Sequence, residues 1–101
     1  MTDAIRFDIK GYVGELCLCA PELRNAIGTR EISLVTAAIN SIPDTCRLFV
    51  IRSEGPVFCA GANLKEIADG TMNGEDFQSM TNAIASLTMP SLAIVEGDVF
   101  L

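Results

Sequence analysis

Apolar and polar residues alternate along two short segments near the start of the chain. The first runs from Ile5 to Ile9, and the second runs from Val13 to Cys19 after a turn at 10–12. A period of two residues is typical of a strand with one buried face, and two such strands joined by a short turn favour an antiparallel hairpin. Pro21 has no amide hydrogen to donate, so it is expected to end the second strand.

Two later segments place apolar residues three and four positions apart, which is the spacing of one helical face. The first face comprises Ile32, Val35, Ile39 and Ile42, and the second comprises Phe77, Met80, Ile84 and Leu87. Thr29 is expected to cap the first helix, because its hydroxyl can accept from an amide at the helix start. Pro43 and Pro90 are expected to close the two helices.

Two short apolar runs, Leu48–Ile51 and Leu92–Val95, stand next to these helical patterns. Such runs are typical of strands covered on both faces. The predicted order is strand, strand, helix, strand, helix, helix, strand, in which Asn63 caps a short helix over 64–67. This alternation indicates an α/β fold. No helix pattern follows the last strand to cover it, so the sequence also predicts a fold truncated after a core strand, at Phe100–Leu101.

The length and charge of the chain exclude several classes of function. The chain has 101 residues, enough for one domain over 1–101, and a formal net charge of −6. With seven Lys and Arg there is no basic stripe to neutralise phosphates, so a nucleic-acid partner is not expected, and neither is an anionic membrane surface. No apolar run approaches the ~20 residues of a membrane span, and the charged first ten residues do not resemble a signal peptide. The sequence therefore predicts a cytoplasmic protein.

Four cysteines are the remaining chemistry-bearing residues of note: Cys17, Cys19, Cys46 and Cys59. Cys17 and Cys19 are two apart, so they are expected on the same face of a strand. A redox pair or metal site is one interpretation, but there is no C-x-x-C spacing and no histidine. Inert thiols in the core are the favoured interpretation, and no metal is predicted.

The segment from Gly55 to Lys65 could approach a ligand closely, because small residues surround Gly61 and a helix is expected at Asn63. Amides at such a turn suit a carbonyl oxygen that gains negative charge. From the residue types alone, however, the favoured interpretation is a tight turn that needs small residues only for packing. The spacing does not fit a P-loop. Without histidine, a Ser-His-Asp or Cys-His arrangement is excluded.

The carboxylates show no acid/base pair in their spacing. Glu54, Glu66 and Asp69 are interpreted as solvated charges. Glu96 directly follows a predicted core strand, at the edge where α/β folds tend to place ligands, so it remains a candidate.

Four segments in register resemble the crotonase superfamily, the enoyl-CoA hydratase/isomerase family. They are 24–26, 47–55, the signature-like stretch 58–66 with the sequence FCAGANLKE, and 90–97. The resemblance implies a partial crotonase-type β-β-α spiral, trimeric or otherwise homo-oligomeric assembly, and acyl-CoA thioesters of fatty acid metabolism as substrates, with no cofactor. The signature usually has aspartate where Asn63 stands, and asparagine keeps the capping ability.

The resemblance also implies roles for particular residues. The backbone amide of Ala62 would be the first donor of an oxyanion hole, and Ala60, Gly61, Asn63, Leu64 and Lys65 would line the substrate site. Arg24 would lie beside coenzyme A. The second oxyanion amide and the catalytic glutamates of the family would lie beyond Leu101, so the chain alone is expected to be inactive.

Two alternatives come from other function classes. One is a non-catalytic interaction protein that docks onto a full-length crotonase paralogue and buries the strand at Leu92–Val95. The other is a small thiol or metal protein that uses the cysteines.

Overall fold

A four-stranded sheet forms the centre of the fold in the computed structural model, which describes residues 4–99. Its strands are β1 (Ile5–Lys10), β2 (Val13–Leu18), β3 (Leu48–Ser53) and β5 (Ser91–Ala93), in that spatial order. β1 and β2 pair antiparallel, which confirms the predicted hairpin, whereas β2 with β3 and β3 with β5 are parallel. The predicted truncation at Phe100–Leu101 lies outside the described residues.

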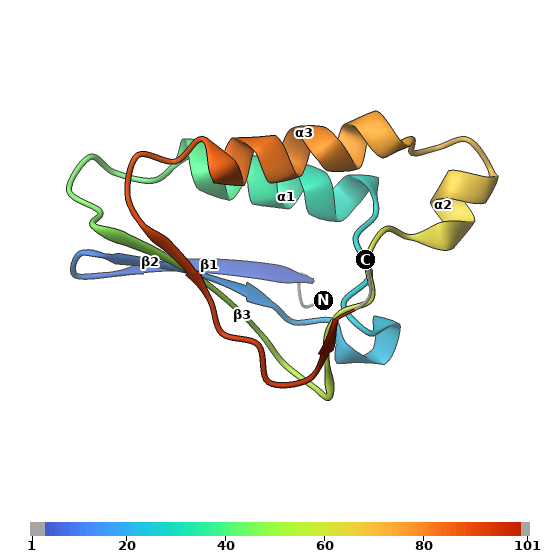
Figure 1. Cartoon of the computed structure of the whole chain (residues 1–101), viewed down its shortest axis with the longest axis horizontal. Coiled ribbons are helices and arrows are strands. Elements are labelled where there is room, and N and C mark those ends of the chain that lie inside the picture. Colours follow the sequence, from blue (N-terminus) through green and yellow to red (C-terminus); the bar gives the residue numbers. More distant parts are fainter. Residues whose placement is uncertain (1–3, 100–101) are drawn as a thin grey trace.

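Two helices, α1 (Thr29–Asn40) and α3 (Gly74–Ala85), lie side by side over one face of this sheet (Figure 1). Parallel neighbours need a crossover connection, and each helix is part of one: α1 between β2 and β3, and α3 between β3 and β5. The core lies between the helices and the sheet. Its most deeply buried members are Phe49, Leu16 and Val35, at 0%, 1% and 2% exposure. The predicted α/β architecture is therefore confirmed.

The predicted burial of Leu48–Ile51 is confirmed, because Phe49 and Val50 lie on opposite faces of β3 and are 0% and 7% exposed. Around Val50, however, the face of the sheet away from the helices carries charged side chains. Phe49 and Ile51 belong to the core, but Arg52 on the same strand is exposed. Glu15 on β2 forms ion pairs across this face with Arg52 at 3.4 Å and Lys10 at 3.8 Å. A short apolar run predicts burial, but it does not reveal that the neighbouring strands alternate apolar and charged residues.

The predicted strand at Leu92–Val95 forms only in part, and the prediction that it is buried is wrong. β5 ends at Ala93, and Leu92, Ile94 and Val95 are 52%, 40% and 49% exposed. β5 is an edge strand, and in the described chain only β3 pairs with it. Large apolar side chains therefore remain at the surface here.

The first helix begins one residue earlier than the sequence predicts. Gly28 is the N-cap and Thr29 is the first helical residue, so Thr29 does not cap the helix as predicted. The Gly28 amide donates to Oε1 of Glu31 at 2.8 Å, which satisfies one amide at this helix start. The apolar face is confirmed, since Val35 is buried and Ile32 and Ile39 pack against the core.

The smaller elements gather at one end of the sheet. They are the 3-10 helix η1 (Pro21–Leu23), strand β4 (Val57–Cys59), helix α2 (Leu64–Ala68) and strand β6 (Asp98–Val99). β4 and β6 pair in parallel, a contact that no sequence pattern predicted. A side chain at Gly97 would place its Cβ 2.2 Å from the carbonyl oxygen of Pro56, so this approach requires glycine. Within residues 4–99, no helix has the length and apolar character to cross a membrane.

Candidate functional site

The signature-like segment leaves β4 through a turn at Gly61 and enters α2. Gly61 has a φ of 87°, a left-handed conformation that residues with a side chain rarely adopt. Its amide lies 3.3 Å from Sγ of Cys59, which is therefore folded back onto the turn. The predicted close turn around Gly61 is present, and the backbone conformation explains why a glycine stands there.

Three backbone hydrogen bonds join this turn to the loop before α1. The Ala60 amide donates to the Arg24 carbonyl at 3.0 Å, the Ile27 amide to the Gly61 carbonyl at 2.8 Å, and the Asn63 amide to the Ile27 carbonyl at 2.7 Å. Two segments more than thirty residues apart in the sequence are thus held side by side.

This pairing determines the direction of the Ala62 amide. Ile27 and Ala62 form a parallel bridge in which Ile27 bonds to Gly61 and Asn63, the residues on either side of Ala62. In such a bridge the amide and carbonyl of the middle residue point away from the partner strand. Among residues 4–99, the Ala62 amide has no hydrogen-bond acceptor. It is a fixed donor whose hydrogen faces away from Ile27.

Asn63 and Glu66 secure the far side of the turn. Oδ1 of Asn63 accepts from the Glu66 amide at 3.2 Å, which confirms the predicted cap of α2. Oε1 of Glu66 accepts from both the amide and the hydroxyl of Thr29, at 3.1 and 2.8 Å. The interpretation of Glu66 as a solvated charge is therefore wrong, because its carboxylate caps the start of α1 from a different helix.

The remaining predicted binding residues differ in their surroundings. Leu64 is 80% exposed and Lys65 is exposed, so both face solvent at the start of α2. Arg24 has a φ of 55° and contacts the turn through its carbonyl oxygen. The structure therefore brings Arg24 together with Ala60 through the backbone, while Leu64 and Lys65 lie at the rim.

Asn25 is a positioning residue that sequence reasoning missed. Its side chain is 2% exposed and accepts from the Ala20 amide at 2.9 Å. It also donates to the carbonyls of Glu54 and Val57, at 3.0 and 2.9 Å. Asn25 thereby ties the loop before α1 to the start of β4. A polar residue between Arg24 and Ala26 in a connector was the available signal, but its partners are distant in sequence.

An apolar cavity of about 120 Å³ lies under the helices beside this turn. It is lined by Phe58 and Cys59 from the signature and by core residues including Ile27, Phe77 and Met80. Burial raises the pKa of the Cys59 thiol, so it stays protonated and apolar. Two residues that contact the turn, Ile27 and Cys59, line this cavity, whereas Ala62 is not one of its lining residues.

Comparisons with known proteins identify relatives of this chain. No family model matches the chain. It is 29% identical to a probable enoyl-CoA hydratase of Rhodobacter capsulatus over 92% of the chain, and 34% identical to a probable mitochondrial enoyl-CoA hydratase of Arabidopsis thaliana over 82%. A putative enoyl-CoA hydratase structure from Rhodopseudomonas palustris matches 93% of the chain with a TM-score of 0.80 and 25% identity.

The chain belongs to the crotonase (enoyl-CoA hydratase/isomerase) superfamily. It matches only part of these crotonases: 38% of the length of the Rhodobacter relative, 30% of the Arabidopsis relative and 38% of the Rhodopseudomonas structure. An enoyl-CoA hydratase/isomerase structure from Marinobacter aquaeolei, at 20% identity and a TM-score of 0.80, shares the fold over 93% of the chain. The described fold is thus a portion of the crotonase fold, as the resemblance implied.

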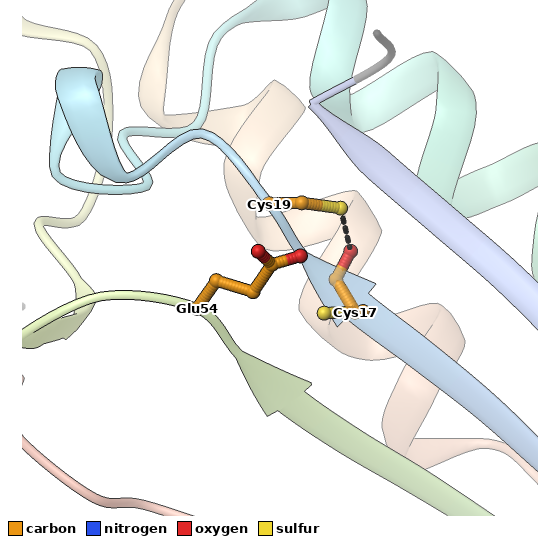
Figure 2. Close-up of side chains that lie close together, drawn as sticks. All are labelled: Cys17, Cys19 and Glu54. Carbon is orange, nitrogen blue, oxygen red and sulfur yellow. Dashed lines mark hydrogen bonds between the residues drawn. The ribbon is translucent and has the colours of Figure 1, made fainter.

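Outside the crotonase signature, the cysteines only partly follow the prediction of buried core thiols. Cys17 and Cys46 are buried, but Cys19 and Cys59 are partly exposed. Cys17 and Cys19 share a face, as predicted, and lie close to Glu54 (Figure 2). Glu54 forms an exposed ion pair with Arg6.

Glu96, the other carboxylate singled out at a strand end, is exposed. It lines a small hollow of about 110 Å³ together with Arg52, Ser53 and Ile94. This hollow contains none of the signature residues, so the described chain does not bring Glu96 into the candidate site. Asp69 is likewise exposed, and hydrogen bonds from Thr71 lower its pKa.

Proposed function

We propose that this chain contributes one half of an acyl-CoA thioester site, in which the Ala62 amide donates a hydrogen bond to the thioester carbonyl oxygen. The observation that supports this is the direction of that amide, which faces away from Ile27 and has no acceptor within residues 4–99. A donor held in place before the substrate arrives needs no reorganisation as charge develops on the oxygen. One donor of this kind typically contributes about 3–4 kcal/mol to transition-state stabilisation.

The other signature residues would bind the rest of the substrate. Ala60, Gly61 and Asn63 form the wall around the carbonyl, and Leu64 and Lys65 lie at the exposed rim with Arg24 on the adjacent loop. Lysine and arginine suit the phosphates of coenzyme A. The apolar cavity of about 120 Å³ is small compared with typical ligand pockets of roughly 300 Å³ or more, so it would accommodate only a short acyl segment.

Residues 1–101 alone would bind a thioester without converting it. They contain no histidine, and the carboxylate of Glu66 beside the turn is already bonded to Thr29. An acid or base positioned at the reacting carbon typically contributes about two to four decades of rate. We therefore assign 1–101 as the N-terminal part of a crotonase-like domain, whose hydratase or isomerase chemistry needs groups from the rest of such a domain.

The proposed role of Ala62 is tested with two ligands, only one of which has a thioester carbonyl oxygen. The ¹⁵N-labelled chain is titrated with butyryl-CoA and with its S-butyl thioether, which lacks the carbonyl oxygen. The expected result is a downfield shift of the Ala62 amide proton with the thioester but not with the thioether. Equal shifts with both ligands, or none with either, would contradict the proposed role of Ala62. Steady loss of enoyl absorbance proportional to the amount of chain would contradict the proposed inactivity.

A second candidate function has its own observation. Leu92, Ile94 and Val95 are exposed along and just after the edge strand β5, where an added strand or a packed layer would bury them. These exposed side chains favour a docking role, in which the chain binds a second crotonase subunit, either another copy or a full-length paralogue. Light scattering during size-exclusion chromatography tests this, and a folded monomer that does not associate with a full-length crotonase would refute it.

A further inference from the structure

Cys17, Cys19 and Glu54 meet at the end of β2, on the face of the sheet away from the helices. The two Sγ atoms and a carboxylate oxygen all lie within 4.8 Å of one another (Figure 2). Cys17 lies on the strand, Cys19 follows the strand end, and Glu54 comes from the loop after the neighbouring β3. Parallel pairing of β2 with β3 is what brings Glu54 to the cysteines, because Leu18 pairs with Ser53.

A cation already lies in this cluster. The Arg6 guanidinium forms an ion pair with Glu54 and hydrogen bonds to Sγ of Cys19 at 3.2 Å and Sγ of Cys17 at 3.9 Å. The side chains of Arg6 and Glu54 are 55% and 48% exposed, so Arg6 can move aside without disturbing the core. The cluster also borders two open hollows of about 440 and 510 Å³, which give it access to solvent.

We propose that Cys17, Cys19 and Glu54 bind one thiophilic divalent cation, such as Zn²⁺ or Cd²⁺, with water in the fourth position. Two thiolates and one carboxylate are ligands that such ions accept, and three protein ligands plus water is the composition of an open zinc site. Binding releases the two thiol protons, so the filled site carries one net negative charge. This assignment does not depend on the proposed acyl-thioester site.

The three ligand atoms are close enough to bind one ion after small movements of their side chains. Zinc–sulfur bonds of about 2.3 Å in a tetrahedral arrangement place two sulfur ligands roughly 3.7 Å apart. Ligand atoms now within 4.8 Å of one another would each have to move by about half an ångström. Cys19 and Glu54 are not buried, so rotation of their side chains can supply this movement.

The test is a Cd²⁺ titration of the purified full chain, kept reduced with a phosphine. Ultraviolet thiolate-to-cadmium charge transfer and the release of protons are both measured. We expect one ion and two released protons per chain. Cys19→Ser is expected to weaken binding at least about tenfold. The matched control Cys59→Ser, which changes a thiol outside the cluster, should leave binding unchanged.

Two further variants examine the exposed partners. Glu54→Gln should weaken binding but keep the charge-transfer band at saturation, since both thiolates remain. Arg6→Gln should tighten binding by about two- to fivefold, because an exposed ion pair no longer has to be broken. No thiolate band, a band that persists in Cys19→Ser, or looser binding by Arg6→Gln would overturn the proposal.

Discussion

Removing the Asn25 side chain tests whether buried hydrogen bonds hold the loop before α1 against the start of β4. The side chain makes three hydrogen bonds of 2.9–3.0 Å and is 2% exposed. A typical hydrogen bond contributes about 1 kcal/mol net, so Asn25→Gly should lower the free energy of unfolding by about 3 kcal/mol. Its backbone has a φ of 56°, which glycine tolerates.

Asn25→Ala separates the backbone contribution from the hydrogen bonds. Alanine loses the same three bonds and in addition adopts a left-handed conformation, at a cost of about 1–2 kcal/mol. Glycine avoids that strain but gains freedom in the unfolded chain, so alanine should be the less stable of the two by about 0.5–1 kcal/mol.

Urea unfolding followed by circular dichroism measures both differences. The control is Asn40→Ala, at the exposed end of α1, which should change the free energy of unfolding by less than about 0.5 kcal/mol. A loss of less than about 1 kcal/mol in Asn25→Ala would contradict the role of the three hydrogen bonds, and an alanine variant more stable than the glycine variant would contradict the backbone contribution.

Three other outcomes are expected. The Ala62 amide should exchange with solvent faster than those of Ile27 and Asn63, which are hydrogen-bonded, and equal protection measured by NMR would contradict the bridge geometry. Glu66→Ala should lower the free energy of unfolding by about 1–2 kcal/mol in urea, whereas Glu22→Ala at the surface should not. Because burial raises the pKa of Cys59, its contribution to stability is complete below about pH 8.5, the ordinary value for a thiol, and is lost as the pH rises through the raised value. Urea midpoints of wild type and Cys59→Ala should therefore converge at alkaline pH, and a constant difference would contradict this.

The elements that the sequence predicted correctly are those with a local pattern. Strand β1 and helices α1 and α3 formed as expected. Their patterns depend only on neighbouring residues: alternation over Ile5–Ile9, and apolar residues three and four positions apart around Val35 and Met80. The short cap at Asn63 is also local, because its acceptor and donor are three residues apart. Such features follow from backbone geometry before any tertiary contact forms.

The features that were missed depend on distant partners. Glu66 looked like a solvated charge because its partner Thr29 is thirty-seven residues away, and Asn25 looked like an ordinary connector residue for the same reason. The exposure of Leu92 could not be inferred from its apolar neighbours, because the pattern does not say whether a further layer covers the strand. The roles of the signature residues came from resemblance, and they remain predictions until the ligand titration is done.

The direction of the Ala62 amide depends on the core, although Ala62 itself is not a core residue. Ile27, which holds the turn on both sides, is 3% exposed and packs in the same cluster as Phe49. Glu66 then fastens the turn to the first residue of α1, whose apolar face completes that cluster. A donor placed in this way can keep its orientation without any side chain of its own, so substitutions in the core at Ile27 should alter thioester binding more than substitutions at the exposed Leu64. For the same reason, residue types within the signature alone could not distinguish a binding turn from a packing turn. The distinction depends on which backbone groups of the turn hydrogen-bond to Ile27, and on the fact that the Ala62 amide does not.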